Sequence, residues 1–176
     1  GTLRRQPDGA NGQEGDDHSG GAAITPDGRT VVVNSTANNL VPGSGGPNQE
    51  VYLWDLTSDT FLPQPDGVDG ARPNGQTFAT GVSDDASVVL LASSATNLVS
   101  GPRLQRWALY VWHVLDGTYQ RQPMDLDGTI PEDELFGTGR MSADATVVVF
   151  DSWSDRWVVG DQNDAQDVFV WDLTTG

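Results

Sequence analysis

The chain has 176 residues, enough for one domain of ordinary size with a buried core. Its 25 acidic side chains outnumber 9 arginines, with no lysine, and the net charge of −16 makes nucleic acid and anionic membranes poor partners. The absence of cysteine excludes disulfides, thiolate metal sites and cysteine catalysis, and no apolar run approaches the roughly 20 residues that a membrane helix needs.

The strongest pattern in the chain is a unit that recurs three times. Each unit has a Ser/Thr-x-Asp turn before an apolar run, and later a Tyr/Phe-x-Trp strand. Both markers repeat at intervals of 58 and 59 positions, a fixed spacing that is typical of a repeat architecture. The markers are Asp27, Asp85 and Asp144 in the turn, and Trp54, Trp112 and Trp171 in the strand.

Short β-branched and aromatic runs, bounded by Gly, Pro, Asn and Asp, predict an all-β chain. Four strands are expected per unit, with an Asp-Gly or Asp-Ala turn between the first two. In chain order the expected strands are 21–24, 30–34, 51–55 and 60–64, then 78–82, 88–92, 109–113 and 118–122, then 137–141, 147–151 and 168–172.

The third strand of each unit is apolar at consecutive positions, so both of its faces must be covered. Small residues in the first strand fit a crowded axis, and four-stranded sheets repeated around an axis form a β-propeller. We therefore expect three four-stranded blades, at about 20–67, 76–125 and 135–176. A β-sandwich ranks second, because it would show alternating patterns and no fixed spacing.

The two ends of the chain complement each other. The third unit stops after its third strand, and residues 2–9 match residues 60–67, the fourth strand of the first unit. We expect strand 1–9 to be a circularly permuted latch that completes the third blade. Because closed propellers have roughly four to eight blades, the chain is expected to be half of a six-bladed ring. The other half is either a second copy, in a homodimer with the latches exchanged, or further sequence of a longer protein.

Several stretches match one repeat pattern: the Asn-Leu-Val loops at 36–43 and 95–101, the acidic loop and strand at 160–172, and the Asp-Gly loops at 8–12 and 66–75. In these motifs the chain resembles the TolB-type (WD40-like) β-propeller repeats of bacterial secreted and cell-envelope proteins. The resemblance covers nearly the whole chain. It implies a propeller fold, a periplasmic, cell-envelope or extracellular location, and a role as a protein-binding platform, an envelope component or a non-catalytic domain of a hydrolase.

Blade topology places the long loops at one end of the molecule, opposite the tight turns. Long polar loops on a rigid scaffold are where binding usually occurs, so this long-loop face is the expected functional face. It is acidic, and one of its loops could supply several oxygen ligands to a structural calcium ion: Asp161, Asn163, Asp164 and Asp167. The alternative is that these residues only form turns.

We expect no enzyme, because the sequence contains no Gly-x-Ser-x-Gly elbow, zinc-binding histidine pair or phosphate loop. His18 between Asp17 and Ser19 is read as a solvated loop residue. The residues expected to contact a partner or ligand are Trp107, Trp153, Arg103, Arg106, Arg156, Asp16, Asp17, His18, Asp127 and Glu132.

The function expected from these features is a non-catalytic propeller module that binds a protein through the long-loop face. Two alternatives stay open. Trp107 and Trp153 would serve a lectin-like, glycan-binding propeller by stacking on sugars. An accessory propeller domain of a secreted hydrolase is the other.

Overall fold

The structure is a computed structural model that describes residues 1–101, 107–126, 128, 139–163 and 165–175. Regular structure in these ranges consists of strands only, and the described chain forms no helix that could span a membrane. The first sheet contains β1 (Ser19–Ile24), β2 (Thr30–Ser35), β3 (Glu50–Asp55) and β4 (Thr60–Pro63). The second contains β5 (Thr77–Val82), β6 (Val88–Ser93), β7 (Ala108–His113) and β8 (Thr118–Arg121). The third contains β9 (Arg140–Met141), β10 (Val147–Ser152) and β11 (Asp167–Asp172).

Each sheet is an antiparallel meander, in which strands adjacent in sequence pair with each other. The all-β class and the strand positions predicted from the sequence are confirmed, apart from one or two residues at the ends. β9 spans Arg140–Met141, and residues 137 and 138 of the expected strand 137–141 lie outside the described ranges. Residues 1–18 form no strand within the single chain.

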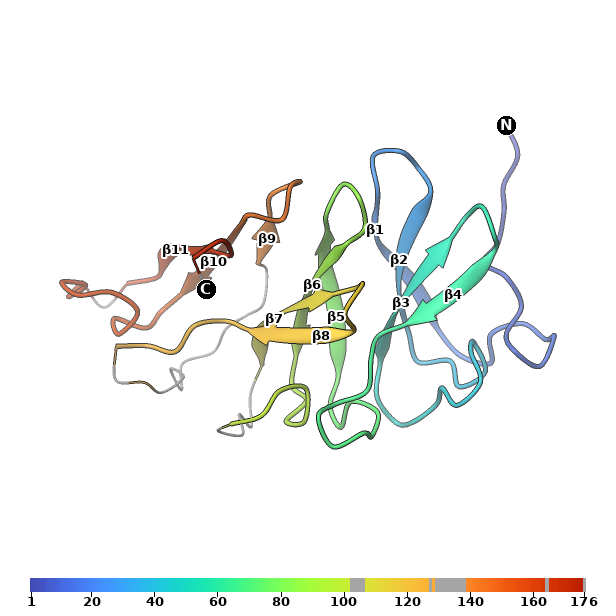
Figure 1. The fold of residues 1–176 in the computed structure, drawn as a ribbon, viewed down its shortest axis with the longest axis horizontal. Coiled ribbons are helices and arrows are strands. Elements are labelled where there is room, and N and C mark those ends of the chain that lie inside the picture. The colour runs from blue at the N-terminus through green and yellow to red at the C-terminus, as the bar shows by residue number, and fades with distance from the viewer. Residues whose placement is uncertain (102–106, 127, 129–138, 164, 176) are drawn as a thin grey trace.

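The three sheets pack face to face in chain order, as Figure 1 shows. Tyr110 and Trp112, on one face of β7, contact the core shared with the first sheet. Leu109 and Val111, on the other face, contact the core shared with the third sheet. The first strands of the sheets lie together, since β5 contacts both β1 and β9. The second sheet is therefore buried on both faces.

The third sheet departs from the expectation that both faces of every Tyr/Phe-x-Trp strand are covered. Phe169 and Trp171 of β11 are buried against the second sheet, but Val168 and Val170 on its other face are 70% and 67% exposed. The corresponding residues of β3 and β7 are buried because another sheet packs on them. No described segment of the chain packs on this face of β11.

Candidate functional site

The tight turns at one end of the molecule are built in the same way in all three sheets. In the second sheet the Ser83 hydroxyl donates to the Asp85 carboxylate at 2.8 Å, and the Val88 amide donates to the Ser83 hydroxyl at 3.0 Å. The Ser87 hydroxyl and amide also donate to Asp85, and with Ser83 they lower the pKa of this carboxyl to about 2. The same bonds recur at Thr25 with Asp27 and at Ser142 with Asp144, and both aspartate pKa values are lowered.

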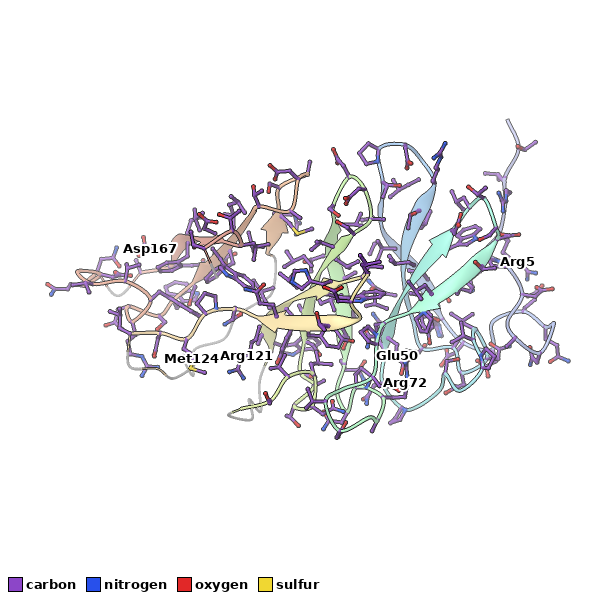
Figure 2. The ribbon with its side chains drawn as sticks, viewed as in Figure 1. Arg5, Glu50, Arg72, Arg121, Met124 and Asp167 are labelled. Atoms are coloured by element: carbon purple, nitrogen blue, oxygen red, sulfur yellow. The ribbon has the colours of Figure 1, made fainter. Side chains whose placement is uncertain are left out.

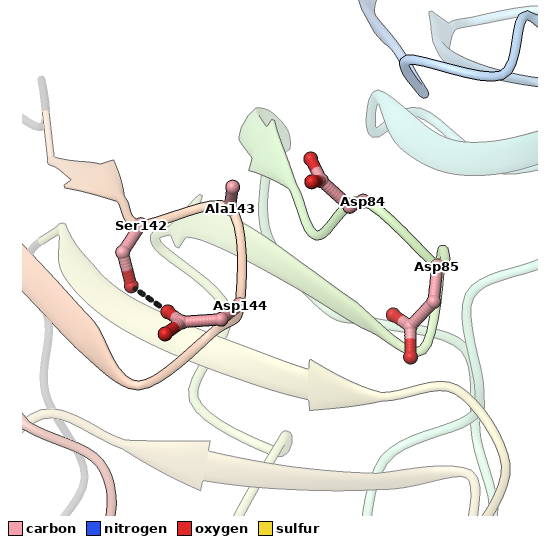
Figure 3. A pocket seen from close by; sticks show the side chains of 5 residues that line it. All are labelled: Asp84, Asp85, Ser142, Ala143 and Asp144. Atoms are coloured by element: carbon pink, nitrogen blue, oxygen red, sulfur yellow. Dashed lines mark hydrogen bonds between the residues drawn. The ribbon is translucent and has the colours of Figure 1, made fainter.

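A groove of about 590 Å³ lies between the turns of the second and third sheets. Figure 3 shows that it is lined by Asp84, Asp85, Ser142, Ala143 and Asp144. Two of its three carboxylates accept hydrogen bonds from their own turns, and the Asp84 amide donates to the Ala143 carbonyl across the groove at 2.8 Å. The groove is therefore a junction between turns. No described group of three or more His, Asp or Glu side chains is arranged to hold a metal ion.

At the opposite end, Asn39 holds the loop that precedes the first sheet, and Asn97 holds the loop between the first and second sheets. The Asn39 side chain accepts a hydrogen bond from the Asp16 amide at 3.0 Å and donates to the Glu14 carbonyl at 2.7 Å. Asn97 holds the next loop in the same way, through the Asn74 amide and the Arg72 carbonyl. The loops pass so close that a Cβ at Gly9 would lie 2.1 Å from the Asn39 carbonyl oxygen, and one at Gly67 would lie 2.4 Å from that of Asn97.

Two of the expected partner residues belong to these clasps. The Asp16 carboxylate accepts from the Asn38 amide at 2.6 Å, so it fastens the first loop. Arg156 takes the asparagine position in the third sheet: its carbonyl accepts from the Leu126 amide at 3.0 Å, and its Nε lies 3.4 Å from the buried Asp125 carboxylate. Trp157 beside it is partly buried and packs on Phe150.

His18 and Asp17 form an exposed pair. His18 Nδ1 lies 2.5 Å from Asp17 Oδ1, and this hydrogen bond is the main reason why the Asp17 pKa is lowered. The Ser19 hydroxyl does not face the imidazole; it bonds to Ser35 at 2.8 Å and accepts from Gln6. The three consecutive residues therefore do not form the convergent arrangement of a hydrolytic triad.

The aromatic candidates lie in two different settings. Trp107 stacks against Phe78, with ring centroids 5.3 Å apart, and both rings are partly exposed. Trp153 is 56% exposed where the chain leaves β10. Four other candidates for partner contact lie outside the described residues: Arg103, Arg106, Asp127 and Glu132.

The expected calcium loop is described except for Asp164. Asn163 Oδ1 accepts a hydrogen bond from the Ala165 amide at 3.0 Å, which closes a turn within the loop. One carboxylate oxygen of Asp167 is buried and has no hydrogen-bond partner among the described residues. Calcium binding by Asp161, Asn163, Asp164 and Asp167 stays a prediction.

Comparison with known proteins bears on the fold. No model of a protein family matches the sequence, and no curated protein matches it. Among solved structures, TolB from Acinetobacter baumannii resembles the chain with a TM-score of 0.50, at 19% sequence identity, over 89% of this chain and 30% of TolB. The fold is TolB-like. At this identity the similarity concerns the fold alone, and this chain spans about 30% of the length of TolB.

Within this TolB-like fold, the third sheet carries a hollow at the long-loop end, lined by both apolar and charged side chains, that the sequence patterns did not reveal. The hollow, of about 260 Å³, is lined by exposed Leu126, Val158 and Val159 together with Arg156 and Asp161. The sequence did hold one signal for this hollow, because Val158 and Val159 are consecutive apolar residues in a polar loop. Their proximity to Leu126 could not be predicted, because it depends on how the loop between the second and third sheets docks.

A buried ion pair also escaped the sequence patterns. Glu50 at the start of β3 is paired with Arg72 from the next inter-sheet loop, as Figure 2 shows, and it accepts a hydrogen bond from the Tyr52 hydroxyl at 2.8 Å. Burial and then the Glu50 charge raise the Tyr52 pKa. The Arg72 guanidinium also donates to the Gln64 carbonyl at 3.0 Å, so the pair fixes the loop to the first sheet.

Proposed function

We propose that this chain is a non-catalytic β-propeller module that binds a protein partner through its long-loop face. The observation that carries the proposal is the hollow in which three exposed apolar side chains, Leu126, Val158 and Val159, gather beside charged residues. Exposed apolar side chains that gather on an otherwise polar surface mark interaction sites. The TolB-like fold supports a module of this kind without naming its partner.

The chemistry of the hollow suggests what it binds. Asp155 and Asp161 line it beside the valines, and the chain as a whole carries a net charge of −16. An apolar side chain flanked by basic residues would fill the hollow and pair with its acidic rim. We propose a partner with such a segment, in the periplasm, the cell envelope or the extracellular space.

The test is selection of binders from a random peptide library displayed on phage. We expect enriched peptides that combine an apolar residue with Arg or Lys, and we expect Val158→Asp to weaken their binding more than about tenfold. Ile24→Asp is the matched control, because Ile24 is similarly exposed but lies beside the tight turns at the other end. Peptides that bind Val158→Asp as well as the parent chain would refute the proposed face.

A glycan-binding function is the second candidate, favoured by the exposure of Trp153. Indole rings stack on sugar faces, and Trp153 projects at the long-loop end beside the hollow's loop. A glycan array distinguishes the two functions. Specific glycan signals that disappear in Trp153→Ala would favour the lectin, whereas an unresponsive array leaves the protein-binding module as the better account.

A further inference from the structure

The free edge of β11 lacks a neighbour that the other two sheets have. β4 pairs with β3, and β8 pairs with β7, whereas the described third sheet ends at β11. A glutamine follows each fourth strand and fastens it. The Gln122 amide donates to the Leu109 carbonyl at 2.9 Å, and its side-chain oxygen accepts from the Leu109 amide at 2.7 Å. Gln64 makes the same two bonds with Val51.

The segment Thr2 to Gln6 has the sequence of such a fourth strand. Its Thr, its apolar residue at the second position and its Gln-Pro-Asp-Gly continuation match the chain from Thr60 onward. In the single chain it forms no strand, and Leu3 is fully exposed, whereas the equivalent Phe61 packs on Tyr52 and Trp54.

The contacts of the loop after residue 8 show which sheet the segment Thr2 to Gln6 would complete. The Ala10 amide donates to the Asn39 carbonyl at 2.7 Å, as the Val68 amide does to Asn97 at 2.8 Å. The loop after residue 8 therefore sits on the first sheet as the loop after β4 sits on the second. By this equivalence, residues 2–6 are the fourth strand of a sheet that precedes the first sheet in the stack.

The outer face of the third sheet is the surface that such a preceding sheet would present. Its Val149, Val168 and Val170 are 38%, 70% and 67% exposed. Their equivalents in the first two sheets are at most 5% exposed, because the next sheet covers them. These equivalents are Val32, Val51 and Leu53, and Leu90, Leu109 and Val111.

The segment does not reach β11 of its own chain. Figure 1 places the N-terminus and β11 at opposite ends of the stack, and Figure 2 shows Arg5 and Asp167 equally far apart. The charges of the two elements are complementary: the segment carries Arg4 and Arg5, and β11 begins and ends with an aspartate. A second copy presents the complementary element to each, an open sheet edge to the segment and a segment to the open edge.

We propose that residues 2–6 of one copy add to β11 of a second copy as the fourth strand of its third sheet, so that the outer face of that sheet packs on the first copy's first sheet. The register follows from β3 with β4 and from β7 with β8. Its pairs are Thr2 with Asp172, Leu3 with Trp171, Arg4 with Val170, Arg5 with Phe169 and Gln6 with Val168.

One consequence of this register concerns Asp167. Arg5 lies opposite Phe169, so Asp167 is its diagonal neighbour on the same face, a separation that a long side chain spans. The Asp167 carboxylate oxygen that has no hydrogen-bond partner among the described residues then receives one from the Arg5 guanidinium. Backbone pairing along an open sheet edge provides the affinity, and the apolar face adds buried area.

The first experiment measures mass in solution by light scattering over a range of concentrations. We expect a species of about twice 18.8 kDa that dissociates on dilution. Val170→Lys should raise the dissociation constant more than about tenfold, whereas Leu115→Lys, at an exposed leucine outside both this face and the hollow, should leave it nearly unchanged. Leu3→Asp and Gln6→Ala should also weaken association. A monomer at every concentration overturns the proposal.

The second experiment tests the register with introduced cysteines, which is simple because the chain has none of its own. Arg4→Cys with Val170→Cys places two thiols on directly paired strand positions, within disulfide range. Arg4→Cys with Val168→Cys is the matched control, shifted by two residues. We expect a covalent dimer from the first pair only, seen on a non-reducing gel. Equal cross-linking of both pairs would overturn the register. Because none of the cysteine positions lies in the hollow, failure here leaves the proposed function untouched.

Discussion

A hydroxyl and a carboxylate two residues apart account for the turn that organises each sheet. Ser83 and Asp85 satisfy the backbone amides of the turn, as Thr25 with Asp27 and Ser142 with Asp144 do in the other sheets. The residue after the aspartate adopts a left-handed backbone in every case: Gly28 has φ 68°, Ala86 φ 58° and Ala145 φ 55°. Only the first sheet has glycine at this position.

Replacing Ala86 or Ala145 by glycine should therefore stabilise the protein. An L-residue in the left-handed region costs about 1–2 kcal/mol, and the greater entropy of glycine in the unfolded chain offsets about 0.4–1 kcal/mol of the gain. We expect Ala86→Gly to raise the free energy of unfolding by up to about 1 kcal/mol, measured by urea unfolding. Ala143→Gly, in the next turn but with a negative φ, should lower it. A loss of stability in Ala86→Gly would refute this account.

At the scale of elements, loops hold the sheets together through polar clasps. Asn39 fastens the loop before the first sheet, Asn97 fastens the loop before the second, and Arg156 takes the same place before the third. The Glu50–Arg72 pair is one of the buried links, since the Glu50 side chain is 5% exposed. Removing one partner of a buried pair leaves an uncompensated charge, which costs more than the pair itself contributes.

Arg72→Ala should lower the free energy of unfolding by about 3 kcal/mol, because among the described residues it leaves the buried Glu50 carboxylate with only the Tyr52 hydroxyl as donor. The double substitution Glu50→Gln with Arg72→Met should recover most of that loss. Arg29→Ala, which removes an exposed arginine beside Asp27, should change stability by less than about 0.5 kcal/mol. Urea unfolding of all three variants measures these differences, and an Arg72→Ala value close to that of Arg29→Ala would contradict the role given to the pair.

At the scale of the whole molecule, the stack of sheets has two unlike ends. One end presents the open face and edge of the third sheet, and the other carries residues 1–7 beside the first sheet, where Arg4 lies over the Trp54 ring at 5.6 Å. The proposed contact between these two unlike surfaces is a head-to-tail, heterologous interface. Copies joined in this way form a closed ring only when the rotation between neighbouring copies permits it.

Limited trypsin digestion should report this association without any substitution. The chain has nine arginines and no lysine, and Arg72 is followed by a proline, which leaves eight trypsin sites, of which two lie in the segment proposed to pair with β11. Cleavage after Arg4 and Arg5 should slow as protein concentration rises, because a paired strand does not fit a protease site. Cleavage after Arg29, in an exposed turn away from the contact, should keep its rate. Mass spectrometry of the fragments measures both, and equal rates at all concentrations would contradict strand exchange.

Local pattern by itself determined the strands, the turns and the all-β class. The spacing of apolar residues, the turn residues and the Tyr/Phe-x-Trp motif can each be recognised within a few positions. Because the unit recurs three times, each assignment is supported by three copies. The repeats also predicted a propeller, and the observed fold is TolB-like.

Tertiary structure alone decided what the loop residues do. Asp16 and Arg156 are loop clasps, and Val158 with Val159 meets Leu126 in a hollow, because segments far apart in the sequence are brought together by the docking of one loop on the next sheet. The position of each sheet in the stack likewise decides how its third strand is buried. β3 and β7 are covered on both faces, whereas Val168 and Val170 of β11 are exposed. The three strands have similar sequences, so the difference arises only from position in the stack.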